Sequence, residues 1–586
     1  MASHAFRWHI PVFLAPAVLV YTAIMIIPLF GTLNLSLYNR DGNTEIFVGL
    51  ANFATLFGDP NWSGAFWNAL GNNAWFFVVH MLVQNPIGVL LAALLSSPRL
   101  RMAAVYRTAI FVPAILSFVI VGFVWKLILS PIWGIAPGML DWVGLKFLYL
   151  PWLGKEDYAL TTLALISVWQ FVGIPMMLIY AALLNIPSEV LEAAEMDGIT
   201  GSSQFWKIKL PLILPSIGII SILTFVGNFN AFDLIYVAQG ALAGPDIRPT
   251  SWAPIFTALS LGFSCNSAIR IWGPPLPLRC SASSCWGCAF ISSPSRRGCV
   301  AISFRGIKMA TRTPLSRSIA AHSVLIAYSA ICLFPVFVVL INSFKSRKAI
   351  FADPLAVPTA DTFDLIGYTT VLKQGDFFQY FLNSMTITVG SLFFVLLFGA
   401  MAAFALSEYR FKGNTLTGLY LALGIMIPIR LGTVAILQLM VVSGLVNTRT
   451  ALVLVYTAQG LPLAVFILSE FMRQVSDDLK NAGRIDGLSE YRIFFTLVLP
   501  LVRPAMATVA VFSLIPIWND LWFPLILAPA EAVKTLTLGS QIFIGQFVTN
   551  WNAVLAALSL AIVPVLILYL IFSRQLIRGI TAGAVK

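Results

Sequence analysis

The residues best suited to catalysis or metal binding do not form a recognisable site. The four histidines, His4, His9, His80 and His322, show neither H-E-x-x-H nor another metal-ligand spacing. The phosphate-binding pattern G-x-x-x-x-G-K-[ST] is absent, and no Ser/His/Asp arrangement can be recognised. We therefore expect that the chain is not an enzyme on its own account. We also expect it to hold no catalytic residue, metal ion or cofactor.

The cysteines are concentrated in one segment of the chain. Five of the six fall between Cys265 and Cys299, and Cys285 and Cys288 have the C-x-x-C spacing of redox and metal sites. Neither a strand–helix context nor a second pair of ligands accompanies this spacing, and a disulfide framework is equally unsupported. We assign no redox or metal chemistry to these cysteines.

Polar side chains within long apolar segments indicate a different kind of chemistry. A polar group is costly in lipid, so it usually faces a cavity or a neighbouring helix. Such residues either line the path of a polar substrate or make interhelical hydrogen bonds, and the sequence leaves both interpretations open. Asp233 and Asp520 lie near the ends of their segments, where interfacial water is within reach. The candidates for a substrate pathway are Gln170, Asn228, Asn230, Gln438, Trp518 and Asn519.

The composition places these segments in a membrane. Of the 586 residues, 59% are hydrophobic and 10% are charged, whereas an ordinary soluble domain carries roughly 25% charged residues. The mean hydropathy is +0.88. So little polar surface cannot cover a soluble globule, and we expect membrane lipid to cover it instead. The net charge of +12 comes from basic residues beside apolar runs, which indicates membrane topology and not nucleic-acid binding.

Apolar segments long enough to cross a bilayer recur from end to end. Lys and Arg collect on the cytoplasmic side, so the basic loops after the second and fourth spans of each half face the cytoplasm. The N-terminus faces the same side, and no removable signal peptide is evident. We predict eleven spans, near residues 10–32, 72–96, 108–130, 159–184, 212–238, 318–343, 383–407, 415–442, 449–472, 501–529 and 553–575.

An internal repeat relates the two halves of the chain. A segment beginning at Glu192 matches one beginning at Asn481 without a gap. The two are therefore parallel copies of one membrane unit. The matched pairs, each 289 residues apart, are Asp197 and Asp486, Gly198 and Gly487, Phe205 and Phe494, Pro211 and Pro500, and Pro215 and Pro504. Farther upstream, Asn72 pairs with Asn383 and Gly88 with Gly399, both 311 residues apart.

Each copy lies between the fourth and fifth spans of its half, on the predicted cytoplasmic side. Pro187 and Ser188 start a short helix and Gly198 ends it, while Asp477 and Gly487 bracket the same element in the second copy. A short exposed helix with small residues and an acid is suited to dock into a cleft on another protein. The alternative is an amphipathic helix resting on lipid headgroups, for which acidic residues are poorly placed.

The repeated segment resembles the EAA loop of binding-protein-dependent ABC importer permeases. It is most similar to the carbohydrate-uptake branch, the maltose-type pair of membrane subunits. The first half resembles one partner and the second half the other. The matching residues of the loop are Glu192-Ala193-Ala194, Asp197-Gly198, Ile208 and Leu210-Pro211; those outside it are 232–236 (FDLIY), 404–413 (FALSEYRFKG), Trp518-Asn519-Asp520 and 579–586 (GITAGAVK).

The resemblance implies an all-α integral membrane protein with the ABC type I importer permease fold. Two parallel-repeat halves of about five to six transmembrane helices each would be joined in one multi-pass chain of the bacterial plasma (inner) membrane. Two cytoplasmic ABC ATPase subunits would bind the EAA helices and hydrolyse ATP, and an extracytoplasmic solute-binding protein would deliver a sugar-type substrate. The residues expected to couple to the ATPase are Glu192, Ala193, Ala194, Asp197, Gly198, Asn481, Ala482, Gly483, Asp486 and Gly487.

The resemblance divides the chain into two units and a junction. The first unit covers 1–245, with its core at about 68–245, and the second covers 309–586, with its core at about 379–575. The junction at 246–308 is rich in Cys, Ser, Pro and Arg. Its basic residues favour the cytoplasm, so a sixth crossing is required, yet the best candidate has only 13 residues, Ser251 to Phe263. Two alternatives stay open: a stretch read in a shifted frame, which replaces the sixth span, or a true linker with a distorted span.

The second copy departs from the EAA pattern. Asn481 stands where the first copy has Glu192, and Gly483 where it has Ala194. A glycine within a helix costs about 1 kcal/mol relative to alanine, so we expect weaker or differently arranged coupling through the second half.

Two alternative functions stay open for the whole chain. The first is a secondary (ion-coupled) transporter, which also uses two parallel halves, and the second is an inactive frame-disrupted fusion product.

Overall fold

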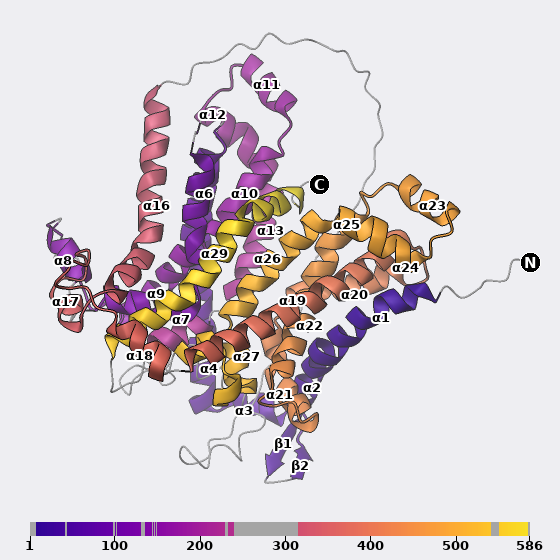
Figure 1. Ribbon diagram of the computed structural model, residues 1–586, viewed down its shortest axis with the longest axis horizontal. Coiled ribbons are helices and arrows are strands. Elements are labelled where there is room, and N and C mark those ends of the chain that lie inside the picture. The colour runs from indigo at the N-terminus through magenta and orange to yellow at the C-terminus, as the bar shows by residue number, and fades with distance from the viewer. Residues whose placement is uncertain are drawn as a thin grey trace, which may run out of the picture.

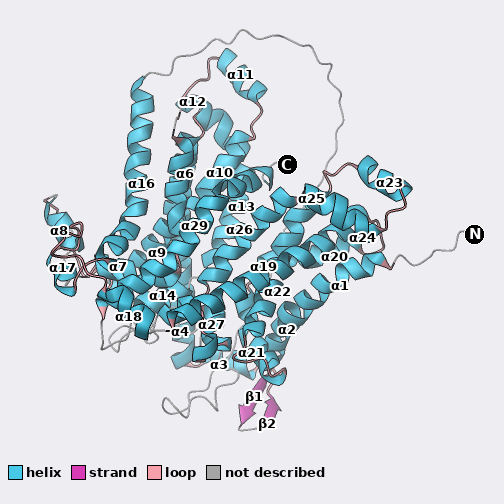
Figure 2. Cartoon of the chain, viewed as in Figure 1, coloured by secondary structure: helices cyan, strands magenta, loops and turns pink. Residues whose placement is uncertain are grey.

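The fold comes from a computed structural model, which describes residues 8–41, 44–97, 100, 102–130, 135–142, 144–145, 147, 149–228, 232–239, 315–374, 376–540 and 550–583. Nearly all regular structure in these ranges is helical (Figure 2). One antiparallel hairpin joins strands β1 (Tyr38–Asp41) and β2 (Thr44–Phe47). The predicted all-α class is confirmed. The junction at 246–308 lies outside the described residues.

The first half begins with α1 (His9–Tyr21) and ends with α14 (Phe232–Gln239). Its other helices are η1 (Thr22–Ile26), α2 (Ile27–Leu35), α3 (Ala51–Gly58), α4 (Pro60–Val79), η2 (His80–Gln84), α5 (Asn85–Leu95), α6 (Ala103–Phe111), η3 (Val112–Ile115), α7 (Phe118–Ile128), α8 (Ile135–Trp142), α9 (Glu156–Phe171), α10 (Gly173–Leu184), α11 (Ser188–Met196), α12 (Ser202–Gln204), η5 (Phe205–Lys209) and α13 (Leu210–Asn228).

The second half begins with α16 (Leu315–Ser343) and ends with α29 (Trp551–Gly583). Its other helices are α17 (Arg347–Ala352), α18 (Ile366–Gln374), α19 (Phe377–Glu408), α20 (Asn414–Met426), η7 (Ile429–Gly432), α21 (Thr433–Val442), α22 (Arg449–Met472), α23 (Asp477–Ile485), α24 (Glu490–Arg492), η8 (Ile493–Val498), α25 (Leu499–Leu501), α26 (Arg503–Asn519), α27 (Trp522–Leu527), η9 (Glu531–Val533) and α28 (Leu536–Ser540).

The predicted spans coincide with helices or with bent pairs of helices. Over the described residues, six helices are long and apolar enough to cross a membrane, and four bent pairs bring the number to ten. A shorter apolar stretch, Trp551–Ile567, falls on the eleventh predicted segment. The prediction of 212–238 as one span was too long, because α13 ends at Asn228 and α14 starts at Phe232.

Four spans that look continuous in the sequence are broken in the structure. The two sharpest breaks occupy equivalent places in the third span of each half, with bends of 97° between α6–η3 and α7 and of 89° between α20 and η7–α21. Pro428 lies within the second break, and Pro113 lies in η3, which leads into the first. A proline cannot donate a backbone hydrogen bond and its ring crowds the preceding turn, whereas hydropathy does not register the interruption.

The first span of each half packs against the other half. Helix α1 lies along α19 and α22, and α16 lies along α6 (Figure 1). A hydrogen bond of 2.7 Å joins the hydroxyls of Thr22 and Tyr420, and one of 2.9 Å joins the hydroxyl of Tyr106 to Nδ1 of His322. The two parallel units are therefore interlocked.

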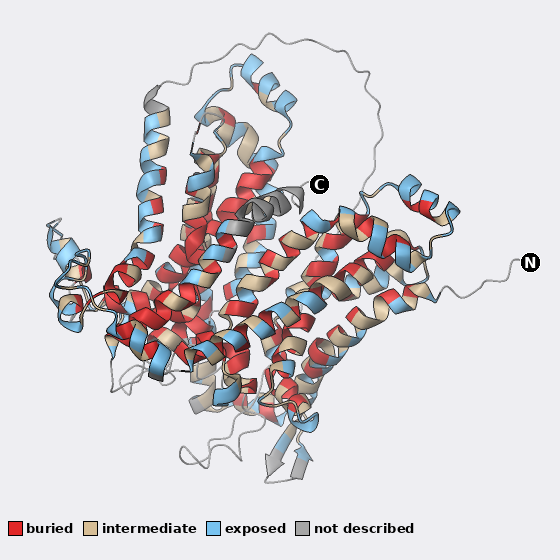
Figure 3. Ribbon diagram, in the orientation of Figure 1, coloured by how far each residue is buried: buried red, intermediate tan, exposed pale blue. Residues whose placement is uncertain are grey.

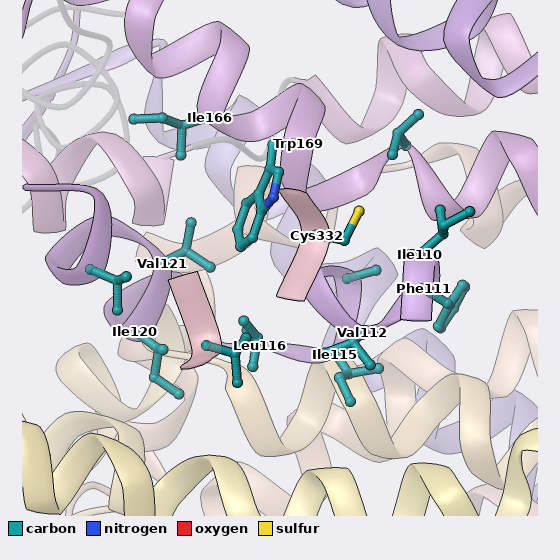
Figure 4. Close-up of a cluster of buried hydrophobic side chains, with 14 of the residues drawn as sticks. Ile110, Phe111, Val112, Ile115, Leu116, Ile120, Val121, Ile166, Trp169 and Cys332 are labelled. Atoms are coloured by element: carbon teal, nitrogen blue, oxygen red, sulfur yellow. The ribbon is translucent and has the colours of Figure 1, made fainter. Parts of the chain in front are cut away.

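The largest buried cluster is built from both halves. Buried residues follow the middle of the bundle (Figure 3). Figure 4 shows part of the cluster, where Ile115, Leu116 and Trp169 of the first half lie near Cys332 of the second. Trp518 belongs to the same cluster. Because the break at Ile115 is packed by residues of both units, its geometry depends on how the two halves sit together.

Candidate functional site

The first repeated segment forms a nine-residue helix, α11, that ends in a backbone cap. Gly198 has a φ of +77°, a left-handed conformation that favours glycine. Its N–H donates to the carbonyl of Glu195 (3.0 Å), and the N–H of Ile199 donates to that of Ala194 (2.8 Å). These two bonds form a Schellman motif, which satisfies carbonyls that the helix end leaves free.

The second repeated segment ends in the same way. Helix α23 also has nine residues, and Gly487 has a φ of +76°. The N–H of Gly487 donates to the carbonyl of Arg484 (3.1 Å), and the N–H of Leu488 donates to that of Gly483 (2.9 Å). The repeat of sequence is therefore a repeat of hydrogen bonding, although the residues supplying the carbonyls differ.

Both helices expose a large apolar side chain at their last position. Met196 is 88% exposed and Ile485, its equivalent 289 residues later, is 86% exposed. Val190 and Leu479 form a second equivalent exposed pair. Figure 1 shows α11 and α23 at the upper margin of the bundle, opposite the β1–β2 hairpin at the lower margin. Apolar side chains exposed twice in the same way favour contact with another protein.

The other predicted coupling residues are divided between the exposed and the packed side of these helices. Ala194 and Gly483 are buried. A Cβ at Gly483 would lie 2.9 Å from Cδ1 of Leu497, so an alanine there would require the Leu497 side chain to shift. The exposed residues are Glu192, Ala193, Asp197, Gly198, Asn481, Ala482, Asp486 and Gly487.

The second repeated helix, α23, is tied to its own half by ion pairs. The Glu408 carboxylate at the end of α19 accepts hydrogen bonds from Lys480 (2.5 Å) and Arg484 (2.6 Å). Arg484 also donates to Glu490 (2.8 Å), which accepts a bond of 2.6 Å from the Tyr409 hydroxyl. Lys480 also pairs with Asp477 (2.7 Å), and we call Glu408, Asp477, Lys480, Arg484 and Glu490 the α23 clamp. In α11 the positions of Lys480 and Arg484 are taken by Leu191 and Glu195, and Leu191 instead accepts a backbone-carbonyl bond of 3.2 Å from Gln204.

The clamp fixes the charges of its members. Burial alone would lower the pKa of Lys480, but its bonds to Asp477 and Glu408 outweigh burial and raise that pKa. The bond from Lys480 in turn lowers the pKa of Asp477. Hydrogen bonding to Glu490 is the main cause that raises the pKa of Arg484. All three groups are therefore charged at neutral pH.

Two pathway candidates are bonded to the broken span of the first half. Gln170 donates to the carbonyl of Leu116 (3.0 Å), and Asn519 donates to the adjacent carbonyl of Ile115 (2.7 Å). The helix ends at the break and leaves these carbonyls without helical partners. Both side-chain amides therefore form hydrogen bonds between helices. The Oε1 atom of Gln170 is buried without a hydrogen-bond partner.

No hydrogen bond or ring contact among the described residues brings the remaining pathway candidates to one place. Trp518 is buried, with its ring 5.9 Å from that of Phe381. Asn228 is buried at the end of α13, and Gln438 is half-buried on α21. Asn230 lies outside the described residues.

A buried ionic cluster was missed by the sequence analysis. Arg430, in η7, donates to Asp233 (2.7 Å) and to Asp520 (3.1 Å). The side chains of Asp233, Asp520 and Arg430 are 1%, 10% and 12% exposed. The expectation that Asp233 and Asp520 reach interfacial water was wrong, because each pairs with the guanidinium. The available signal was the isolated arginine inside the apolar segment 415–442.

Comparisons with known proteins agree with the duplicated architecture. A family model described as "Binding-protein-dependent transport system inner membrane component" matches residues 84–264 and again residues 395–582. The diacetylchitobiose uptake system permease protein NgcG of Streptomyces coelicolor is 33% identical over 268 residues, which cover 45% of this chain and 88% of that protein. The melibiose/raffinose/stachyose import permease protein MelC of Bacillus subtilis is 30% identical over 276 residues, covering 47% and 99% respectively.

A solved structure shares a lower similarity. It is described as a bacterial ABC transporter involved in the import of the acidic polysaccharide alginate. The identity is 22% and the TM-score 0.41, with 45% of this chain and 99% of the other covered. As with the curated relatives, less than half of this chain matches nearly all of the other.

Proposed function

The chain belongs to the family of binding-protein-dependent transport system inner membrane components, and we propose that it joins both permease units of an ATP-driven carbohydrate importer. The double match to the family model supports two units in one chain. The relatives NgcG and MelC are named for uptake of oligosaccharides, which supports a sugar-type substrate here. On this proposal the chain forms the translocation pathway and is not itself an enzyme.

One observation carries the proposal: α11 and α23 end in the same Schellman cap, and each exposes a large apolar side chain at its last position. We call these side chains, Met196 and Ile485, the apolar knobs. A pair of equivalent knobs on one side of the bundle suits two copies of one kind of partner. These partners are two cytoplasmic ABC ATPase subunits, which bind and hydrolyse ATP. The N-terminus then lies in the cytoplasm and the β1–β2 hairpin faces the solute-binding protein outside.

Site-directed crosslinking tests this assignment. In a chain whose six native cysteines are replaced by serine or alanine, Met196→Cys and Ile485→Cys are each treated with a thiol crosslinker in membranes containing the ATPase subunits. We expect both to capture an ATPase subunit. Phe47→Cys, exposed on the hairpin, is the matched control and captures none. Labelling of Met196→Cys from the outer face alone would refute the topology.

Transport measurements separate the proposal from the alternatives. In proteoliposomes we expect sugar uptake to require ATP, the two ATPase subunits and the solute-binding protein. Uptake driven by an ion gradient without ATPase subunits would instead identify a secondary transporter. Failure of the full-length chain to accumulate in membranes would support a frame-disrupted product, which resequencing of the junction would decide.

A further inference from the structure

The Arg430 cluster joins the two halves at a break in the pathway-forming helices. Asp233 belongs to the first half, whereas Arg430 and Asp520 belong to the second. Arg430 lies in η7, which continues the third span of the second half after its 89° bend. The Arg430–Asp233 pair therefore crosses between the halves, whereas the Arg430–Asp520 pair lies within the second half.

A reciprocal contact occurs at the equivalent break of the first half. Asn519, next to Asp520, donates to the carbonyl of Ile115, the last residue of η3. In each half, a polar residue at or just after the end of the fifth span therefore reaches the broken third span of the opposite half. The two contacts use different chemistry, an ion pair on one side and an amide–carbonyl bond on the other.

Helix lengths place both breaks toward the outer face. On the proposed topology, α20 starts at the cytoplasmic side and its 13 residues rise about 20 Å. Helix α6 and η3, with nine and four residues, rise roughly 22 Å. The apolar core of a bilayer is about 30 Å thick, so both breaks lie beyond its midplane.

The two carboxylates of the cluster differ in how firmly they are held. Asp520 accepts bonds from Arg430, from the Tyr456 hydroxyl (2.9 Å) and from the backbone N–H of Phe523 (3.0 Å), all within the second half. Asp233 accepts from Arg430 through Oδ2, while its Oδ1 is buried without a hydrogen-bond partner. The Arg430–Asp520 pair is thus built into one half, and the Arg430–Asp233 pair is the separable one.

We propose that the Arg430–Asp233 pair is an ionic latch that holds the outer end of the pathway closed, and that it separates each time the halves rock apart to accept substrate. The inference rests on the proposed function. Asp520 keeps the guanidinium paired when the latch is open, because a buried charge without a partner would be costly. Asp233 then faces the opened pathway, where a carboxylate can accept bonds from sugar hydroxyls.

The latch is tested in proteoliposomes holding the chain, its two ATPase subunits and, where stated, the solute-binding protein. Asp233→Asn removes the charge of the latch and leaves the Arg430–Asp520 pair. We expect ATP hydrolysis without the solute-binding protein to rise about tenfold, the change produced by a loss of about 1.4 kcal/mol from the closed state. Glu470→Gln, which removes the exposed Arg473–Glu470 pair within one half, is the matched control and leaves this basal rate unchanged.

Two further variants make the test specific. The exchange Asp233→Arg with Arg430→Asp keeps one guanidinium between two carboxylates and is expected to restore a low basal rate. Asp233→Cys with Arg430→Cys, in the chain without native cysteines, is expected to lose uptake when a short bifunctional thiol reagent bridges the pair. A cleavable reagent should return uptake after reduction.

The outcomes distinguish the latch from the proposed function. If the unmodified chain shows no uptake dependent on ATPase and solute-binding protein, the proposed function fails. If it does, a basal rate of Asp233→Asn equal to that of the unmodified chain overturns the latch. Continued uptake by the bridged cysteine pair also overturns it. Loss of assembly with the ATPase subunits in Asp233→Asn would make Asp233 a structural residue and overturn it as well.

Discussion

Arg484 of α23 lies 2.6 Å from the Glu408 carboxylate at the end of α19, across 76 residues of sequence. The equivalent residue of α11 is the exposed Glu195. Helices α11 and α23 thus share their length, their cap and an exposed apolar side chain at the last position, but differ in attachment. Helix α23 is fixed by ion pairs to a membrane-spanning helix, so any force on it passes directly to α19. The two copies therefore differ in this clamp as well as at Asn481.

Glu408→Gln should loosen α23. The change leaves Lys480 and Arg484 without the carboxylate they share, and removing one partner of a buried pair typically costs about 3 kcal/mol. Because Arg484 keeps Glu490 and Lys480 keeps Asp477, we expect roughly half of that cost. Hydrogen exchange of the α23 amides, measured by mass spectrometry on the purified complex, should accelerate about tenfold. Unchanged exchange would show that the clamp does not hold α23.

The matched change in the first half is Glu195→Gln. Glu195 is exposed on α11, where single surface charges contribute little. Exchange of the α11 amides is therefore expected to stay as in the unmodified chain. An equal acceleration in both helices would contradict the difference in attachment.

Gly198→Ala and Gly487→Ala should impair coupling to the same extent. Both glycines have φ near +77° or +76°, and a Cβ at either would meet nothing within 4 Å. The cost of about 1–2 kcal/mol is therefore one of backbone conformation alone. We expect ATP-driven uptake to fall several-fold in each variant. Gly218→Ala and Gly418→Ala, in open space within regular helices, are the controls and leave uptake unchanged.

Much of the fold could be predicted from hydropathy and the repeat. The length of the apolar segments located the spans. The shared Gly198 and Gly487 located two helix ends, because a helix commonly ends at a residue with positive φ, which glycine adopts most readily. The breaks in the third spans escaped prediction, since proline occurs in continuous membrane helices as well. The interlocking of the first spans also escaped, because Thr22 and Tyr420 meet across 398 residues with no local pattern to indicate it.

The candidate site was predictable only in part. The repeated motif located the helices α11 and α23, but the clamp depends on Glu408, which lies outside the repeated segment. In-span polarity identified Gln170 and Asn519 without showing their partners. The isolated Arg430 inside an apolar segment was the available signal for the ionic cluster, because an intramembrane arginine requires an acidic partner and Asp233 and Asp520 are the acids near the span ends.

At position 483 we expect glycine to support sugar uptake better than alanine does. At the equivalent position 194 we expect alanine to stabilise the helix better than glycine does. Gly483→Ala gains about 1 kcal/mol of helix propensity but brings a Cβ within 2.9 Å of Leu497. We expect uptake to fall modestly and to recover in the double variant with Leu497→Ala. Ala194→Gly loses propensity without relieving a contact, so it should weaken protection of α11 by roughly fivefold in hydrogen exchange. Improved uptake in Gly483→Ala alone would contradict the packing explanation.

The protection that the clamp gives to α23 should not change with pH between the titration of Asp477 at low pH and that of Lys480 at high pH. The pKa of Asp477 is lowered, so its contribution is present above the ordinary value of 3.8 and is lost as pH falls through the lowered value. The pKa of Lys480 is raised, so its contribution is present below 10.5 and is lost as pH rises through the raised value. Protection of the α23 amides, corrected for intrinsic exchange, should be constant from about pH 5 to 9.

Lys480→His should bring this dependence into the physiological range. An imidazole ordinarily titrates near 6.5, and a carboxylate partner raises its pKa, so the protonated form holds the clamp at low pH. Protection of α23 should then fall as pH rises through about 7, while Lys480→Arg stays constant. A protection profile of Lys480→His that is flat across this range would show that the ion pairs of residue 480 do not contribute.

Gln170 and Asn519 decide between the two interpretations of polar residues in the spans. Each donates to a carbonyl exposed by the break of the first half, so Gln170→Leu or Asn519→Leu should cost about 1–3 kcal/mol through an unsatisfied buried carbonyl. We expect the yield of assembled complex and its melting temperature to fall, while the KM for sugar uptake by the remaining complex stays constant. A pathway role predicts the opposite, an increased KM with normal assembly. Gln438→Leu, at a half-buried candidate on α21, is the comparison and should raise the KM.

The double variant Gln170→Leu with Asn519→Leu tests whether the two bonds support each other. Because the adjacent carbonyls of Ile115 and Leu116 receive these bonds from different halves, the double variant should lose more stability than the two single variants together. Strict additivity would show that the break is held independently on each side.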